Sequence, residues 1–253
     1  MMKAYRLLSH CMIIAGIALI LALSAHQGLA QDKERAKESA DAVLSRLGGL
    51  DIERSRGSVD TELAARHNRR GNTYSNLDRL EDAIREYQLS IAADPNQADS
   101  IRNLANIYYF QERYDEAIPY LARYIRLQTE ITTPLISALQ TLGELLRSRQ
   151  QYEEAIAIDL RTIEVSPDND SQVHIMGNTY NNAGRIDLAI QIYAKAIEVM
   201  PENAFFYRTL GRLYESEAQL AEALAQYRTA AELEPDSRFY QDLVSGLEAR
   251  LAQ

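Results

Sequence analysis

Beyond residue 30 the sequence has no cysteine, and it contains no tryptophan anywhere. The single cysteine, Cys11, lies inside an apolar segment near the N-terminus. The remainder of the chain therefore forms no disulfide and offers no thiolate nucleophile, Cys-ligated zinc site or iron–sulfur cluster. Histidine is nearly as scarce, because only His67 and His174 follow residue 30, and they are too far apart for a metal-binding motif. We predict no metal site.

Catalytic motifs are also missing. The sequence has no Gly-rich phosphate loop, no serine nucleophile elbow and no calcium-binding loop. The acidic pairs Glu81-Asp82 and Glu153-Glu154 stand where helices are expected to begin, and carboxylates there complement the positive end of the helix. Capping and solvation explain them better than acid–base chemistry. We predict that the protein is not an enzyme and needs no cofactor.

Residues 1–30 have the pattern of an export signal. Lys3 and Arg6 precede an uncharged run of 13 residues, Cys11 to Leu23, and small residues lead to Ala30. This run is shorter than the roughly 17 to 25 residues of a membrane-spanning helix. We expect cleavage of the signal and a periplasmic or similar envelope location. An uncleaved anchor that holds the rest of the chain outside the cytoplasm is the alternative.

The chain is acidic. Its net charge is −9, and removal of residues 1–30 takes away Lys3, Arg6 and no acid, which leaves −11. A surface with this charge repels DNA and anionic lipid over most of its area. We therefore predict no nucleic-acid partner, and no membrane insertion once the signal is cleaved.

A repeat of 34 residues runs through most of the sequence. Small residues recur with gaps of 34, 38, 34 and 34, at Gly71, Ala105, Gly143, Gly177 and Gly211. A second series, at Ala83, Ala117, Ala155, Ala189 and Ala223, has the same gaps in the same order. Two independent series in one register indicate a true internal repeat.

Each unit carries a helical pattern around its small residue. In the fifth unit Tyr207, Leu210, Gly211 and Tyr214 are spaced as i, i+3, i+4 and i+7, which places them on one helix face. The alanine series marks a second helix in each unit. A proline then follows in four of the units, where that helix must end, at Pro95, Pro167, Pro201 and Pro235.

These motifs resemble the tetratricopeptide repeat family, in five copies at 64–97, 98–131, 136–169, 170–203 and 204–237. The resemblance implies an all-α, right-handed solenoid of antiparallel helix pairs. The first copy departs from the family pattern at His67 and Arg70, where apolar residues are usual. The third has Leu146 in place of a tyrosine and Asp159 in place of an aromatic residue, so we expect looser packing there.

Both ends of a stacked array need a cap. Residues 238–253 carry the stripe Phe239, Leu243, Leu247 and Leu251, which predicts a C-terminal capping helix. Residues 31–63 are interpreted as an N-terminal capping helix and a polar linker at 50–58, because a similar stripe ends at Gly48-Gly49; it consists of Ala36, Ala40, Val43, Leu44 and Leu47. Four extra residues, Thr132 to Leu135, separate the second and third units. They form either a hinge or a turn without consequence.

The resemblance also implies a binding surface, because in this family the first helices line a concave groove. The corresponding positions are unusually rich in asparagine: eight of the eleven asparagines lie in 25 positions, where an even spread would place about one. Asparagine is a poor helix former, so another demand must favour it. The candidate binding residues are Asn68, Arg69, Asn72, Asn76, Arg102, Asn103, Asn106, Tyr109, His174, Asn178, Asn181, Asn182, Arg208 and Arg212.

Carboxamides both donate and accept hydrogen bonds, which suits the backbone of an extended peptide whatever its side chains. The four arginines favour an acidic or carboxylate-bearing segment. A carboxylate clamp of the kind that some family members use is not predicted, because Asn68, Ser137 and Thr141 stand where that clamp has basic residues. A groove that is only a wet, polar surface is the simpler alternative.

We therefore expect a non-enzymatic adaptor or assembly factor that binds an extended peptide segment of a partner protein in its groove. It would act as a monomer or as a subunit of a hetero-complex. One alternative is a structural subunit of an envelope secretion, pilus or outer-membrane complex that docks through its outer faces. A second is a cell-wall or carbohydrate binder, for which Tyr109 and Phe110 are the stacking candidates.

Overall fold

The computed structural model describes residues 40–49 and 59–252. All regular structure in that part of the chain is α-helical. The predicted signal at 1–30, Ala36 of the N-terminal stripe and the linker at 50–58 lie outside the described residues. None of the described helices is both long enough and apolar enough to cross a bilayer.

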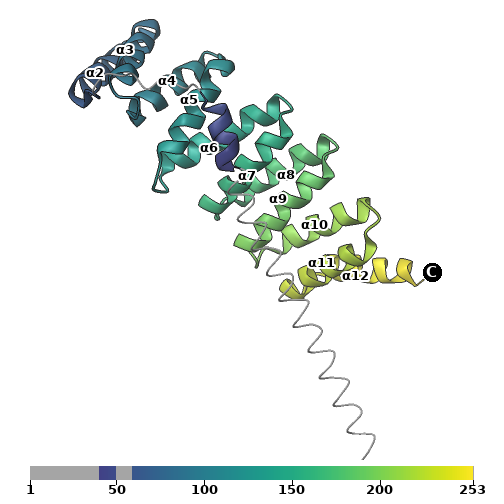
Figure 1. Cartoon of the computed structure of the whole chain (residues 1–253). Helices are drawn as coiled ribbons and strands as arrows, with labels where there is room; N and C mark the ends of the chain where they lie inside the picture. Colours follow the sequence, from purple (N-terminus) through teal and green to yellow (C-terminus); the bar gives the residue numbers. More distant parts are fainter. Residues whose placement is uncertain (1–39, 50–58, 253) are drawn as a thin grey trace, which may run out of the picture.

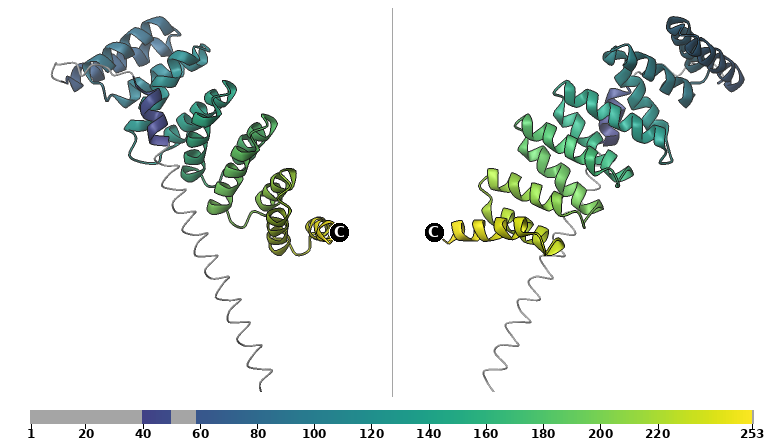
Figure 2. Two further views of the ribbon diagram at one scale, coloured as in Figure 1. Left: turned by 45° about the vertical axis from the view of Figure 1, so that its right-hand side comes forward. Right: turned by 180° about the vertical axis from the view of Figure 1, so that it is seen from behind.

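Eleven helices, α2 to α12, follow the short helix 40–47 and form an extended, curved stack (Figures 1 and 2). Ten of them form five antiparallel pairs, each within one predicted unit, and the fold class is the predicted all-α solenoid. Their bounds are α2 Thr61–Asn76, α3 Leu80–Ala93, α4 Ala98–Phe110, α5 Tyr114–Leu127, α6 Thr133–Ser148, α7 Tyr152–Val165, α8 Asp170–Asn182, α9 Ile186–Val199, α10 Ala204–Ser216, α11 Leu220–Leu233 and α12 Arg238–Leu251.

In the four units whose small residue is glycine, that residue meets a side chain of the second helix of the pair. A methyl group added at Gly71 would lie 2.5 Å from the ring of Tyr87, and one added at Gly211 would lie 2.6 Å from the ring of Tyr227. Both tyrosines are buried. The absence of a side chain on the first helix therefore lets the aromatic ring of the second helix lie directly against its backbone.

The turn between the two helices of a pair is the same in all five units. Seven residues after each small residue the backbone enters the left-handed region, and the next amide donates to a carbonyl five residues earlier. The left-handed residues are Asp78, Glu112, Gln150, Gly184 and Ala218, with φ between 57° and 73°. Only the fourth unit uses the glycine that this conformation favours.

The four extra residues between the second and third units lie in a loop and in the first turn of α6. Thr132 is the N-cap of α6 and accepts a hydrogen bond from the Leu135 amide, and Pro134 stands in the first turn, where it needs no helical partner. The insertion thus gives α6 16 residues, against 13 in α4.

The C-terminal helix α12 packs on α11, as a cap is expected to, but it buries a different face. Tyr240 and Leu247 are buried and Leu243 is half-buried against α11, whereas Phe239 and Leu251 of the predicted stripe are exposed. The helix rotates so that Tyr240 replaces Phe239 in the contact. Phe239 consequently projects from the array beside Arg208.

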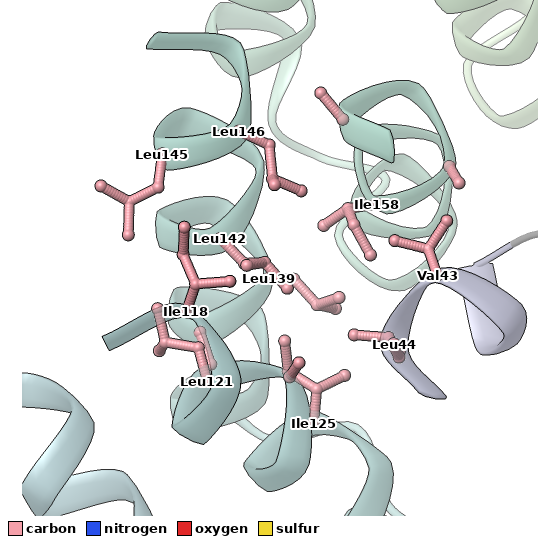
Figure 3. Close-up of a cluster of buried hydrophobic side chains, with 14 of the residues drawn as sticks. Val43, Leu44, Ile118, Leu121, Ile125, Leu139, Leu142, Leu145, Leu146 and Ile158 are labelled. Atoms are coloured by element: carbon pink, nitrogen blue, oxygen red, sulfur yellow. The ribbon is translucent and has the colours of Figure 1, made fainter. Parts of the chain in front are cut away.

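Helix 40–47 is not at the position expected of an N-terminal cap. It lies in the middle of the array, beside α5, α6 and α7, and not over α2 (Figure 1). Val43 faces Ile158 of α7, and Leu44 points into the cluster of α5 and α6 side chains (Figure 3). Arg46 pairs with Glu154, and Asp41 with Arg161, both on α7.

The reason lies in equivalent positions of the first and third units. Leu139 and Ile158, which face helix 40–47, stand four residues before Gly143 and three after Ala155. The same positions in the first unit hold His67 and Glu86, which bond each other at 2.6 Å. An apolar helix over that pair would find no apolar side chain to pack against, whereas Leu139 and Ile158 gain from cover. The polar residues His67 and Arg70 therefore let the first unit end the array without a covering helix. Arg70 bonds Glu86 at 3.0 Å.

The close approach within each pair generates a stability prediction. Gly211→Ala should lower the free energy of unfolding by about 1–2 kcal/mol, because overpacking against the buried Tyr227 exceeds the gain in helix propensity. Gly246→Ala in α12 is the matched control: nothing lies within 4 Å of the added methyl, so stability should rise by about 0.5–1 kcal/mol. Urea unfolding of both variants checks the pair, and equal shifts would contradict it.

Candidate functional site

The predicted binding residues all lie on the first helices of the pairs, where the structure leaves most of them accessible. Most of the amides and the basic residues Arg69 and Arg212 are exposed, while Arg102, Asn103, Tyr109, Asn178 and Arg208 are partly buried. Asn68 is the exception, because it is 9% exposed and its Oδ1 accepts no hydrogen bond. We call the surface formed by these helices the groove face; its helices are α2, α4, α6, α8 and α10.

One group of polar side chains joins the first two units. The Tyr87 hydroxyl donates to Asn72 Oδ1 at 2.7 Å, and Asn103 Nδ2 donates to the same oxygen at 3.0 Å. Asn72 Oδ1 is therefore saturated, while Asn72 Nδ2 and Asn103 Oδ1 have no bond to any described residue. The hydroxyl of the buried Tyr87 fixes the pair, which presents one open donor and one open acceptor.

Four further amides have no side-chain hydrogen bond to the described residues and stay exposed. Asn106 lies near the middle of α4, and the others are at the C-terminal ends of first helices, which places them along one edge of the groove face. These end positions are Asn76, Asn181 and Asn182. Their donors and acceptors are available to a ligand or to water.

A second group spans the fourth and fifth units. Asn178 Nδ2 donates to His174 Nε2 at 2.9 Å, and the Tyr193 hydroxyl lies 3.5 Å from His174 Nδ1. Phe205 meets the imidazole edge to face at 5.1 Å between ring centroids. Burial raises the pKa of Tyr193 to about 12, although the positive charge of Arg208 acts in the opposite direction. This phenol therefore stays neutral at physiological pH.

Arg208 is the one arginine of this second group, and aromatic rings hold it. Its guanidinium carbon lies 4.5 Å from the centroid of Phe205 and 5.9 Å from that of Phe239. Among the described residues it has no carboxylate partner, and its buried Nε donates no hydrogen bond. Cation–π contacts orient the side chain without neutralising its charge, which leaves its donors available to an anionic ligand.

The other predicted arginines differ from Arg208. Arg102 pairs with Asp99 at 3.2 Å and lies 5.9 Å from the ring of Tyr124, so part of its charge is compensated. Arg69 and Arg212 are exposed and form no ion pair with a described residue. Exposed, unpaired arginines act mainly through their long-range field, which salt screens.

Aromatic residues break the polar character of the groove face in the second unit. Phe110 is 80% exposed and meets Tyr109 at 5.6 Å between centroids, and Tyr109 lies 5.9 Å from Tyr114. Such an exposed aromatic group offers apolar contact to a ligand that crosses the end of α4.

The third unit holds a buried polar cluster that sequence reasoning missed. Asp159 occupies the place of the tyrosine ring beside Gly143 and pairs with Arg147, and the Tyr180 hydroxyl of the next unit donates to Asp159 at 2.7 Å. Arg147 stands at a groove position by its spacing, yet only 5% of its side chain is exposed. The signal was present, because Asp159 replaces the aromatic residue of the pattern in a unit that also carries an arginine, Arg147, on its first helix.

Burial governs the titration of this cluster. Desolvation raises the pKa of the Asp159 carboxyl, and the charge of Arg147 opposes that effect. Burial and the neighbouring carboxylate also raise the pKa of Tyr180, which therefore remains a hydrogen-bond donor. The expected loose packing of the third unit is wrong in this respect, because Asp159 and Tyr180 are fully buried and bonded.

No three His, Cys, Asp or Glu side chains come together as a metal-binding group within residues 40–49 and 59–252. The histidine of the groove face, His174, is bonded to an amide and packed on a ring rather than set beside a nucleophile. The arrangement is suited to binding through hydrogen bonds, charge and aromatic contact.

Sequence models described as tetratricopeptide repeat match residues 64–97, 96–168 and 176–238, which together are more than half of the chain. No curated protein sequence matches significantly. Among solved structures, YrrB, described as a TPR protein with an unusual peptide-binding site, is 22% identical and has a TM-score of 0.45. That match covers 70% of this chain and 90% of YrrB.

A MamA structure is 25% identical with a TM-score of 0.45, over 69% of this chain and 93% of its own. MamA 41-end from Desulfovibrio magneticus RS-1 is 15% identical with a TM-score of 0.44, over 72% of this chain and 99% of its own.

The buried cluster of the third unit yields a second prediction. Asp159→Asn should cost about 3–5 kcal/mol of stability, because it leaves Arg147 buried without a counter-charge. Replacing both residues by leucine should cost clearly less, since no charge is then stranded. Asp115→Asn, which breaks the exposed pair with Arg149, is the control and should change stability by at most about 1 kcal/mol. Thermal and urea unfolding measure all three.

Proposed function

Because the chain belongs to the tetratricopeptide repeat family, whose members bind other proteins or peptides, we propose that it binds an extended segment of a partner protein along its groove face. In this role it is a non-enzymatic adaptor or assembly factor. The observation that carries the proposal is the pair formed by Asn72 and Asn103, which Tyr87 holds with one donor and one acceptor open.

That pair matches the chemistry of a peptide backbone. An extended peptide presents N–H and C=O groups in alternation, and the open Asn103 Oδ1 and Asn72 Nδ2 complement one of each. Because the amides are already fixed by Tyr87, little side-chain entropy is lost when the ligand binds. Recognition of this kind is independent of the ligand's side chains.

Selectivity for charge comes from the fifth unit. Arg208 is held between aromatic rings without a carboxylate partner, on a body whose net charge is −9. A carboxylate of the ligand supplies the missing partner, and a charge-assisted bond contributes more than a neutral one. We therefore propose that the ligand carries an acidic side chain or a C-terminal carboxylate where it passes Phe205 and Phe239.

The energetics are sufficient for moderate affinity. Each hydrogen bond contributes a net ~0.5–1.5 kcal/mol, and bonds to a charged group contribute ~1.5–3 kcal/mol. At the upper end of these ranges, four or five amide contacts together with Arg208 and the exposed Phe110 reach the roughly 8 kcal/mol of a micromolar complex. We accordingly place the protein among transient adaptors rather than permanent subunits.

We also propose that binding takes place outside the cytoplasm, in the periplasm or a similar envelope compartment. The support for this location is the charged start, short apolar run and small residues of segment 1–30. The chief rival is docking through the outer faces as a structural subunit of an envelope complex. Groove substitutions separate the two, since outer-face docking does not use the amides.

The amides generate the third prediction. The variant with Asn72, Asn106 and Asn178 changed to alanine should lose partners that the unchanged chain captures from a native envelope extract, as quantified by mass spectrometry. The reason is the loss of backbone contacts in three units without loss of charge. Circular dichroism should show both proteins equally helical.

The control for this capture is Gln191→Ala, which removes an exposed amide from α9, a second helix outside the groove face. It should retain every partner. Partners kept equally by all three proteins would contradict groove recognition and favour docking through the outer faces.

The fourth prediction concerns charge. Arg208→Ala should weaken binding of a captured acidic peptide about tenfold, because one charge-assisted contact is lost. Fluorescence anisotropy with the peptide and with its carboxamide form measures this, and the carboxamide should bind both proteins alike. Arg126→Ala, which removes an exposed arginine from α5, is the control and should leave the affinity unchanged. A uniform loss for both peptides would show that Arg208 is not a carboxylate site.

A further inference from the structure

Helix 40–47 occupies a site that does not belong to the groove face. Its floor is apolar and comes from Ile125 of α5, Leu139 of α6 and Ile158 of α7 (Figure 3). Charged residues close its two ends, since Arg161 bonds Asp41 at 2.8 Å and Glu154 bonds Arg46 at 2.9 Å. We call this site the slot; it consists of Ile125, Leu139, Glu154, Ile158 and Arg161.

The slot has the dimensions of a helix because it stands where a helix of a preceding unit would lie. In the fourth unit the residues equivalent to Leu139 and Ile158 are Val173 of α8 and Ile192 of α9. Both are buried, and α7 of the preceding unit contacts both helices. In the third unit helix 40–47 supplies that cover. Gly48, just after it, reaches the backbone of Ala122 and Arg123 in α5, so the fit includes a close backbone approach.

The attachment of this helix is small. Its buried aliphatic side chains are Ala40, Val43 and Leu44, and its two ion pairs involve exposed partners, Asp41 at 60% and Arg46 at 59%. Exposed ion pairs contribute little, and a helix of eight residues is not stable by itself. Helix 40–47 is therefore held by a contact that can open without unfolding the array.

Chain length lets the released helix reach another molecule. Nine residues, 50–58, separate the described Gly49 from Val59. Fully extended they span about 30 Å, at 3.3–3.6 Å per residue. Exchange of an identical element between two copies creates a dimer with the same contacts as the monomer, so its cost is low.

We propose that the slot is an interaction site for a second copy of this chain, in which two molecules exchange helix 40–47. The occupant is the helix whose fit is visible in one molecule, with its acid two residues before Val43 and its base two residues after Leu44. The exchanged pair closes on itself, because each copy gives one helix and receives one. The groove face is on the first helices, so both groove faces stay open in the dimer.

The test uses two complementary full-length variants. Leu44→Asp cannot donate its helix but keeps its slot, and Ile158→Asp donates its helix but has a blocked slot. Each alone should be monomeric in sedimentation, whereas the mixture should form a one-to-one dimer in which the intact helix fills the intact slot. Fluorescence energy transfer between labelled copies should be at least tenfold higher in the mixture than in either variant alone.

The control is the variant with both changes, which should form no dimer with either partner. Absence of a heterodimer from two folded variants overturns the proposal. A dimer that persists when the donor copy also carries Leu44→Asp overturns it as well, because that dimer does not use the helix.

A second pair of variants leaves the apolar core untouched and decides the matter if Ile158→Asp fails to fold. One copy carries Arg161→Glu and Glu154→Arg in the slot, and the other carries Asp41→Arg and Arg46→Asp in the helix. Within each copy the charges are mismatched, but between the copies both interfaces match. Energy transfer should appear in the mixture, where opposite charges meet at both ends of each slot, and absence of transfer in the mixture overturns the proposal.

Discussion

The structure depends on one contact that recurs in four of the five units, between a glycine on the first helix and the side chain that lies against it from the second. Gly71 with Tyr87 and Gly211 with Tyr227 show the aromatic form, in which an added methyl would overlap the ring. Since the ring can lie this close to the first helix only where that helix has no large side chain, the contact fixes the register of each pair. The same contact anchors the ring whose hydroxyl orients Asn72, so one packing constraint positions both the core and the polar groups of the groove face.

The third unit satisfies that constraint with charge instead of an aromatic ring. Asp159 lies against Gly143 and draws Arg147 inward from a position that the repeat places on the groove face. The middle of the face thereby loses a cation, and the two organised polar groups stand on either side of it, around Asn72 and around Arg208. The open amides and the unpaired guanidinium are thus separated along the array, an arrangement that suits the extended ligand we propose better than a compact one.

The period of the small residues predicted the five helix pairs, because a strict spacing in two series leaves one register. The burial of Arg147 was not predictable from spacing alone, since the pattern assigns a face and not a partner. The predicted position of helix 40–47 was wrong for a similar reason. Its apolar stripe shows that one side is buried, but it does not show which helices bury it. A comparison of equivalent positions contains the answer, because the first unit has the polar residues His67 and Glu86 where the third has the apolar Leu139 and Ile158.

The first unit ends the array without a capping helix because the third unit, and not the first, offers the apolar surface that helix 40–47 covers. The first unit closes itself with the bonded His67, Arg70 and Glu86 and requires no helix over it. The helix that would have capped it is instead bonded to α7, a second helix, while the open amides and Arg208 are on first helices. A ligand on the groove face and an event at the slot therefore use different side chains. The packing of α6 against α7 connects the two, because it contributes Leu139 and Ile158 to the slot and Gly143 and Asp159 to the buried cluster.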